Sequence, residues 1–375
     1  MPKAWRTRSG TMKTFYCDHC GSLVFFENIQ CVKCSHTLGF LPDILDLGAL
    51  EPAADGQWRA LAAPAKRRLY RPCQNGSAHR VCNWYVPTED QNPFCISCRM
   101  NHTIPDLTVT ENRERWHKIE IAKRRLVYTL LSLKLPLDGG QNQPPLQFSF
   151  LADVPGGSKV LSGHENGLIT LNIAEADDAE REKRRTTLHE PYRTLLGHFR
   201  HESGHYYWDQ LIANTAGHNR FRELFGDEQQ DYSAALKTHY ERGAPADWQS
   251  RFVSAYASSH PWEDWAESWA HYLHIVDTVE TAAGFGVSLS PKHPAAKTMT
   301  VDIKKVSHPG AGFDRILKDW MPLTYALNSL NRGMGLPDLY PFVLSDPAVE
   351  KLRFIHETIM RNNPEVDCVK NESLR

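Results

Sequence analysis

Eight of the nine cysteines lie in two groups of four within the first 98 residues, and each group can close its segment of chain around a metal ion. The first group is two Cys-x-x-Cys pairs separated by ten residues, and its members are Cys17, Cys20, Cys31 and Cys34. Two such pairs form the knuckles of a zinc ribbon, whose four thiolates bind one tetrahedral ion. Gly21, after the first pair, and the aromatic pair Phe25-Phe26 fit a ribbon over residues 15–40.

The second group has a less regular spacing. It consists of Cys73, Cys82, Cys95 and Cys98, and His79 or His102 has the chemistry to replace one of its thiolates. The 38 residues between the groups favour two separate sites over an interleaved RING-type arrangement. We therefore predict a second four-cysteine zinc module within residues 41–104. In its first part, residues 41–70, we expect a short helix or turn packed through Leu41, Ile44, Leu45, Leu47 and Leu50.

A disulfide framework and an iron site are the alternatives to zinc in these groups. The chain shows no apolar secretory segment at its start, and adjacent Cys-x-x-Cys pairs in a reducing compartment favour metal over cross-links. We therefore expect metal-bound thiolates and a cytoplasmic location. Iron also binds four-cysteine ribbons, so zinc is a preference at this point. Cys368, alone near the C-terminus, is expected to be an incidental thiol.

Residues 201–205 have the sequence His-Glu-Ser-Gly-His, inside a stretch that is expected to be helical from Pro191 onward. Residues four apart lie on one face of a helix, so His201 and His205 can bind the same metal ion. Glu202 then lies beside the ion and can take a proton from a water in the open coordination position. The pattern predicts the centre of a zinc hydrolase, with Glu202 as general base.

A third metal ligand is expected from a second helix over residues 262–282. Pro261 suits its first turn, and Glu263 and Glu267 share one face. The segment resembles the Glu-x-x-x-Asp/Glu element of gluzincin metallopeptidases. This resemblance implies that Glu263 is the third zinc ligand and that Glu267 hydrogen-bonds a ligand histidine. The alternative is an exposed face with solvated glutamates, against which the aromatic residues crowding this stretch argue.

Tyr256 precedes Glu263 by seven residues, an offset also found in the toxin-type gluzincins that resemble anthrax lethal factor. Its phenol can donate a hydrogen bond to a developing oxyanion. His260 is the alternative donor, and an ordinary half-buried tyrosine is the alternative role for Tyr256. We expect His198, three residues before His201, to be packed or to cap a helix rather than to line the cleft.

The remaining pattern predicts a mainly helical domain with a small sheet. Thr108-x-x-Glu111 resembles a capping box that opens a long helix running to Pro136. Strands are expected at 146–150 and 167–173. Residues 163–173 form either an edge that pairs with an extended peptide or a strand that only covers the core. Further helices are expected near 177–185, 230–241, 313–330 and 346–360, with a helical pair inserted between His205 and Glu263.

The whole chain resembles a bacterial family of zinc-metallopeptidase-like proteins of unknown function with N-terminal zinc ribbons. The resemblance rests on the ribbons and on three further segments: Cys-Asn-Trp at 82–84, His-Phe-Arg-His-Glu-Ser-Gly-His at 198–205, and Ser-His-Pro-Trp-Glu-Asp-Trp-Ala-Glu at 259–267. It implies an α+β protein in which zinc-ribbon modules precede a mainly helical, zincin-like metallopeptidase domain with a small β-sheet. The expected organisation is a basic flexible arm at 1–14, the ribbon at 15–40, the second module within 41–104, a catalytic domain at 105–285 and a C-terminal helical subdomain at 286–375.

The expected cofactors are one catalytic and two structural Zn²⁺ ions, and the expected substrate is a peptide or protein. The ribbons are expected to recruit substrate or a protein partner. A formal net charge of −1 offers no general attraction to nucleic acid, and no apolar run approaches the roughly 20 residues of a membrane span. The alternative function is a non-catalytic binding module for protein or nucleic acid on a pseudo-peptidase scaffold, although a pure binder does not need Glu202.

Overall fold

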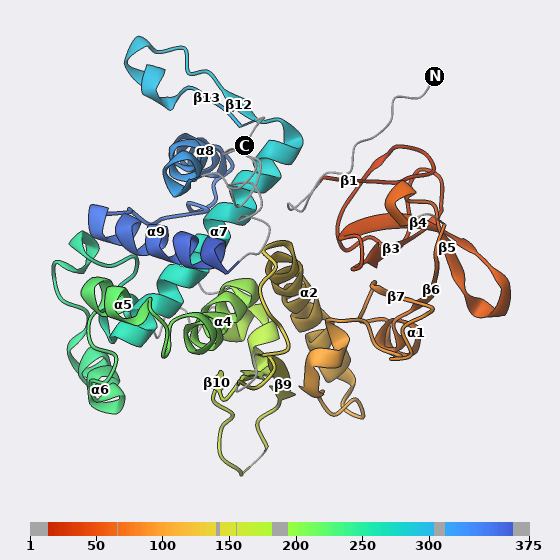
Figure 1. Ribbon diagram of the computed structural model, residues 1–375, viewed down its shortest axis with the longest axis horizontal. Coiled ribbons are helices and arrows are strands. Elements are labelled where there is room, and N and C mark those ends of the chain that lie inside the picture. Colours follow the sequence, from red (N-terminus) through yellow and green to blue (C-terminus); the bar gives the residue numbers. More distant parts are fainter. Residues whose placement is uncertain are drawn as a thin grey trace.

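The computed structural model describes residues 14–65, 67–139, 143–154, 156–181, 194–303 and 312–362. The basic arm, apart from residue 14, lies outside these residues, as do Pro191, the end of the 177–185 helix and Cys368. Figure 1 shows the strands of residues 15–87 on one side of helices α2 (Thr110–Ser132) and α4 (Leu195–Leu211), and the helices of residues 218–361 on the other. Among the described residues, no helix is both long and apolar enough to cross a membrane.

The first ribbon begins as a short antiparallel hairpin. Strand β1 (Phe15–Tyr16) pairs with β2 (Leu23–Val24). Between them, the N–H of Gly21 donates to the carbonyl of Cys17 at 2.8 Å, and the φ angle of Gly21 is +71°. A residue without a Cβ atom adopts this left-handed conformation at little cost. The turn therefore reverses the chain just after the first pair of cysteines.

Residues 37–87 form a five-stranded antiparallel meander, so the short helix predicted around residues 41–50 is wrong, whereas the turn given as its alternative is present at residues 42–45. In spatial order, the strands are β3 (Thr37–Leu41), β4 (Asp46–Pro52), β5 (Trp58–Ala60), β6 (Leu69–Pro72) and β7 (Tyr85–Pro87). Residues 47–50 of β4 are all buried, and a continuous apolar run does not distinguish a buried strand from a buried helix. A bridge between Phe40 and Trp84 brings β3 back to the start of β7, so the meander closes on itself.

An aromatic cluster joins these N-terminal strands to α2. Its members are Phe15, Phe26, Phe40, Trp84 and Tyr128, all of them buried. The ring of Tyr128, on α2, lies 5.5 Å from that of Phe26 and 5.7 Å from that of Phe40. The ribbon, the meander and α2 therefore share one apolar core.

Helix α2 has the predicted apolar face but a different start. Trp116, Ile119 and Leu126 are fully buried on it. The predicted capping box is wrong, because Val109 occupies the N-cap position and makes no side-chain capping bond. The hydroxyl of Thr108 donates instead to the side chain of Asp106 at 2.7 Å, in the loop before the helix.

A four-stranded sheet packs against helix α4. Its order is β10 (Gly163–Glu165), β11 (Leu168–Asn172), β9 (Gln147–Leu151) and β8 (Asn101–Thr103). Strands β9 and β11 confirm the strands predicted there, but within residues 163–173 only β10 lies at an edge, because β11 lies inside the sheet. Helix α4 packs on this sheet through Phe199, whose ring lies 5.5 Å from that of Phe148. Strand β8 closely follows the second cysteine group, so this sheet joins both halves of the chain.

Helix α7 (Pro261–Phe285) crosses α4 at very short range, with Pro261 in its first turn as predicted. A Cβ atom added to Gly204 of α4 would lie only 2.8 Å from Cα of Ala266. The indole N–H of Trp265 donates to the carbonyl of Gly204 at 2.8 Å, and that of Trp269 donates to the hydroxyl of Ser203 at 3.2 Å. This contact places the His-Glu-x-x-His segment beside the acidic first turn of α7.

The other helices surround this pair. Helices α5 (His218–Phe225) and α6 (Tyr232–Arg242) fill the interval between His205 and Glu263, as predicted. Helices α8 (Phe313–Gly333) and α9 (Asp346–Arg361) pack on α7. A hairpin of β12 (Ser288–Leu289) and β13 (Val301–Asp302) follows α7 in the chain. A buried ion pair of 2.6 Å between Lys351 and Asp264 fastens α9 to the first turn of α7. The architecture is the predicted α+β arrangement.

Gly204→Ala is expected to lower the free energy of unfolding by about 1–3 kcal/mol, the usual cost of forcing an extra carbon into a packed contact. The added Cβ would meet the backbone of Ala266, which cannot rotate away. Urea unfolding followed by circular dichroism measures the change. Gly333→Ala is the control, because its Cβ would enter open space at the end of α8. Equal stability of wild type and Gly204→Ala would contradict this account of the helix contact.

Candidate metal centres and active site

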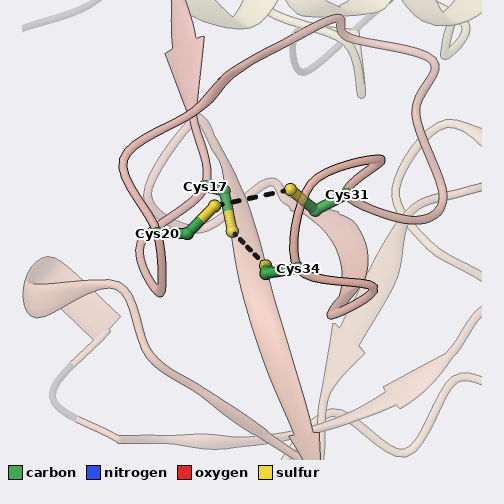
Figure 2. A group of neighbouring side chains, drawn as sticks. All are labelled: Cys17, Cys20, Cys31 and Cys34. Atoms are coloured by element: carbon green, nitrogen blue, oxygen red, sulfur yellow. Dashed lines mark hydrogen bonds between the residues drawn. The ribbon is translucent and has the colours of Figure 1, made fainter.

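The first cysteine group gathers its four sulfur atoms between two loops of the ribbon (Figure 2). The Sγ atoms of Cys17 and Cys34 are 3.6 Å apart, as are those of Cys20 and Cys31. Four thiolates at about 2.3 Å from a tetrahedral zinc ion lie about 3.8 Å from one another. These separations therefore fit a zinc ion at the centre of the group. All eight cysteines that the structure describes are free, so they form no disulfide framework.

The second group gathers Cys73, Cys82, Cys95 and Cys98 as a separate site. The Sγ atoms of Cys82 and Cys95 are 3.7 Å apart, and the backbone N–H of Cys95 donates to Sγ of Cys73 at 3.3 Å. Neither histidine alternative joins this group. The ring of His79 packs 5.6 Å from that of Trp116, and Nδ1 of His102 lies 3.1 Å from the hydroxyl of Thr103.

A buried arginine of α2 supports the second group. Arg124 is 2% exposed, and its Nη1 donates to the carbonyl of Val81 at 2.5 Å. Burial lowers the pKa of this guanidinium, but Cys82 and Glu120 outweigh burial and raise it above its usual value. A fixed positive charge near four thiolates lowers the cost of assembling their negative charge.

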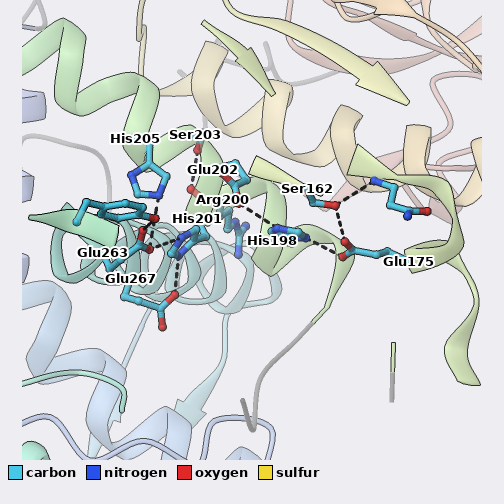
Figure 3. Close-up of polar contacts among 12 residues, drawn as sticks. Ser162, Glu175, His198, Arg200, His201, Glu202, Ser203, His205, Glu263 and Glu267 are labelled. Atoms are coloured by element: carbon cyan, nitrogen blue, oxygen red, sulfur yellow. Dashed lines mark hydrogen bonds and ion pairs between the residues drawn. The ribbon is translucent and has the colours of Figure 1, made fainter. Parts of the chain in front are cut away.

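Two histidines of α4 and one glutamate of α7 converge on one point (Figure 3). Oε2 of Glu263 lies 3.0 Å from Nε2 of His201 and 3.6 Å from Nε2 of His205. The helix begins at Leu195, where the hydroxyl of the N-cap residue Thr194 accepts the N–H of Gly197 at 2.9 Å. The structure thus brings together the three residues that the sequence predicts as ligands of the catalytic zinc.

The surroundings of Glu263 fit a metal ion among these three side chains. Glu263 is 1% exposed, and its Oε2 accepts no hydrogen bond from any described residue. A buried carboxylate oxygen that faces two imidazole nitrogens but accepts no well-directed hydrogen bond from them is costly unless a cation lies between these groups. Burial raises the pKa of Glu263, but the two imidazoles outweigh burial and hold it well below its usual value. An ionised oxygen facing two imidazole nitrogens is the donor set that zinc prefers.

A second layer of hydrogen bonds orients these side chains. Oε1 of Glu267 lies 2.7 Å from Nδ1 of His201, and the hydroxyl of Ser254 donates to Oε2 of Glu267 at 2.6 Å. The phenol of Tyr232, at the start of α6, donates to Oε1 of Glu263 at 2.6 Å. Histidine ligands of metals usually donate their second ring N–H to a carboxylate in this way. Glu267 therefore lies where its predicted role requires.

Tyr256 lies beside the site in the short helical turn η6 (Tyr256–Ser258). Its ring centroid is 5.9 Å from that of His201. Burial, together with the negative charge of Glu263, raises the pKa of its phenol well above the usual value, so the phenol keeps its proton. His260 caps α7 instead: its Nδ1 accepts the N–H of Trp262, and its Nε2 faces the carbonyl of Gln230 at 3.2 Å. Both of its ring nitrogens are thus engaged away from an oxyanion.

Several contacts of the site were not predicted from the sequence. His198 is largely buried, as expected of a packed residue, but it is also paired: its Nε2 lies 3.0 Å from Oε1 of Glu202. Their spacing of four residues within one helix is the signal that could have revealed this pair. Tyr232 and Ser254 gave no such signal. Tyr232 lies 31 residues before its partner Glu263, in a different helix, and Ser254 lies in a loop before α7.

Comparison with known proteins agrees with a zinc site of this kind on a ribbon-bearing chain. Residues 112–358 match the model of the family described as "Putative zinc-binding metallo-peptidase", and residues 14–109 match a zinc-ribbon domain. The chain belongs to this family. An uncharacterized protein of Mycobacterium bovis and one of Mycobacterium tuberculosis are each 42% identical to it over 357 residues, which cover 95% of this chain and 98% of the relative. No solved structure matches the chain.

Glu267→Ala is expected to weaken zinc binding at the His201–His205–Glu263 site by about 10- to 100-fold, because the ring of His201 loses the acceptor that orients it. Competition with a zinc chelator measures the affinity. Glu357→Ala, on the exposed face of α9, is the matched control. An unchanged zinc affinity in Glu267→Ala would contradict the orienting role of this carboxylate.

Proposed function

We propose that this protein hydrolyses peptide bonds as a gluzincin-like enzyme, with zinc bound by His201, His205 and Glu263 and with Glu202 as general base. The observation that carries the proposal is the convergence of the three donor atoms, within 4.8 Å of one another, beside Glu202. Membership of a zinc-binding metallopeptidase family supports the same chemistry. Two further zinc ions in the cysteine groups would bring the total to three per chain.

The mechanism follows from the positions of these side chains. His201, His205 and Glu263 would hold zinc, which would supply Lewis acidity for a carbonyl oxygen and lower the pKa of a water from about 15.7 to about 7. Glu202 takes the proton of this water and passes it to the leaving amine. Burial raises the pKa of Glu202, but His198 outweighs burial and lowers it, so Glu202 is ionised and can accept a proton. Tyr256 donates a hydrogen bond to the carbonyl oxygen as negative charge develops on it.

The substrate in this proposal is an extended peptide that lies along β10. Strand β10 pairs with β11 on one side, and no described strand pairs with its other side. The ring of His164, on β10, lies 6.4 Å from that of His205, so this edge runs beside the site. An added strand is held by main-chain hydrogen bonds. Such binding suits a peptide or protein substrate and leaves side-chain preference to nearby pockets.

Glu202→Gln is expected to lower kcat/KM for a quenched fluorescent peptide by about 10²- to 10⁴-fold, because the general base is lost. The zinc content should stay at about three ions per chain, as measured by plasma mass spectrometry. His201→Ala is the comparison variant: it should fall to about two ions per chain because it removes a ligand. A Glu202→Gln protein that retains wild-type activity would rule out this assignment, and two zinc ions in the wild type would favour the binding-module alternative.

The first ribbon is proposed to recruit a protein substrate or partner. It exposes large apolar side chains: Phe25 is 67% exposed, Ile29 is 68% exposed and Val32 is 94% exposed. Exposed apolar groups that gather on one small module mark interaction sites. The same observation favours the alternative function, a binding module with the helical domain as scaffold. Retention of Glu202 beside the metal site supports the enzyme, because binding alone does not require it.

A photo-crosslinking residue at position 32 tests the ribbon surface in cells that express the protein. We expect a discrete adduct with a second protein, and we expect Phe25→Asp on the same chain to suppress it by placing a charge in the apolar contact. The control is the same crosslinker at position 343, where Val343 is 79% exposed outside the ribbon. Similar adducts from both positions would argue against a specific surface on the ribbon.

A further inference from the structure

His198 bridges two buried carboxylates that come from different segments of the chain (Figure 3). Its Nε2 lies 3.0 Å from Oε1 of Glu202, and its Nδ1 lies 2.8 Å from Oε2 of Glu175. Glu202 is 5% exposed and Glu175 is 1% exposed. One imidazole therefore uses both ring nitrogens to hold two carboxylates that have little contact with water.

Glu175 is held in turn by the segment that carries the edge strand. The hydroxyl of Ser162, just before β10, donates to Oε1 of Glu175 at 2.6 Å. The backbone N–H of Asn172, at the end of β11, donates to the same hydroxyl oxygen at 3.0 Å. Asn172 also caps η4 (Ile173–Ala176), the turn that contains Glu175. A continuous chain of hydrogen bonds thus runs from the β10–β11 hairpin to Glu202.

The charges of this chain favour a protonated His198. Burial disfavours the imidazolium, but Glu175 and Glu202 outweigh burial and raise the pKa of His198 to about 9. Both ring nitrogens of an imidazolium are donors, so His198 can donate to both carboxylates at neutral pH. Hydrogen bonds between charged groups are roughly twice as strong as neutral ones. Other ionisable groups that interact with Glu202 are His164 on β10, His201 and His205 on α4, and the phenols of Tyr232 on α6 and Tyr256 on η6.

The bond from His198 determines how Glu202 presents its carboxylate. Residues 198 and 202 lie one turn apart on the same face of α4, so Oε1 of Glu202 is tied to the helix that carries it. Oε2 is then the oxygen available to accept a proton. A general base must lie within hydrogen-bond reach of the proton that it abstracts, and a freely rotating carboxylate meets this condition only part of the time.

We propose that His198, anchored by Glu175, is a positioning residue that fixes the orientation of Glu202 and couples it to the edge strand β10. The inference rests on the proposed function, because it assigns a role within the same active site. Its rival is a purely structural role, in which the bridge only ties η4 to α4. The two roles predict different values of kcat for variants whose stability and zinc content are unchanged. Only the positioning role predicts that kcat falls.

Kinetics of three variants separate these roles. His198→Ala should lower kcat for a quenched fluorescent peptide on the order of 100-fold, with KM and zinc content unchanged, because Glu202 loses its fixed orientation. His198→Gln should recover part of kcat, since its amide can still donate to Glu202. Arg115→Gln is the matched structural control: Arg115 of α2 pairs with Asp177, directly after η4, at 2.8 Å and does not contact Glu202. Unfolding midpoints are measured for all three.

A nuclear magnetic resonance titration of the histidine rings gives a readout that needs no hydrolysis. The signal of His198, assigned by its loss in His198→Gln, should titrate near pH 9 in the wild type. In Glu175→Gln it should move toward about 6.5, the value of an unperturbed histidine. Titration of the wild-type ring near pH 6.5 would overturn the bridge itself.

The outcomes also distinguish this inference from the proposed function. If the wild type hydrolyses peptides but His198→Ala loses no more kcat than Arg115→Gln, the positioning role is overturned and the peptidase proposal stands. If the wild type carries zinc at His201, His205 and Glu263 and hydrolyses no peptide, both proposals fall, whatever the titration of His198. A selective loss of kcat in His198→Ala, with partial recovery in His198→Gln, supports both.

Discussion

The close packing of α4 against α7 is the contact on which the rest of the site depends. Gly204 leaves no side chain between the helices, so the backbone of Ala266 approaches it directly. Because two of the proposed zinc ligands lie on α4 and the third lies on α7, a small separation of the helices would pull Glu263 away from both histidines. Indole hydrogen bonds from Trp265 and Trp269 hold the pair together on the side away from solvent. The glycine at the second x of His-Glu-x-x-His is thus a packing requirement of this fold that the motif itself does not specify.

Charge compensation is the second constraint on the site. Glu175, Glu202 and Glu263 are all nearly inaccessible to water, and buried carboxylates persist only with close partners. His198 pairs with Glu175 and Glu202, and the imidazoles of His201 and His205 face Glu263. A zinc ion among His201, His205 and Glu263 would add positive charge beside Oε2 of Glu263, which accepts no well-directed hydrogen bond. The electrostatic balance of the site therefore agrees with its donor geometry.

The N-terminal modules are built into the helical domain rather than attached by a linker. Aromatic rings of the ribbon and the meander surround Tyr128 of α2, and β8 belongs to the same sheet as the edge strand. Arg124 reaches from α2 to the second cysteine group, while Glu120 of the same helix accepts hydrogen bonds from Trp116 and Asn101. Helix α2 also packs against α4. Structural metal in the cysteine groups would thus support the helix on which the active-site helix rests.

The sequence by itself determined the parts of this protein that depend on local spacing. Some features are properties of short segments and could be predicted without knowing the fold. They are the cysteine pairs, the four-residue spacing of His201 and His205, and the helical periodicity of α2 and α7. The spacing of Glu263 and Glu267 placed both on one helix face, but their pairing with the histidines needed a family resemblance. The tertiary structure alone decided the meander at 37–87, whose buried apolar run has no distinguishing period. It also decided the links of Glu175 to His198, of Tyr232 to Glu263 and of Lys351 to Asp264, because each pair joins elements whose separation along the chain is unrelated to their distance in space.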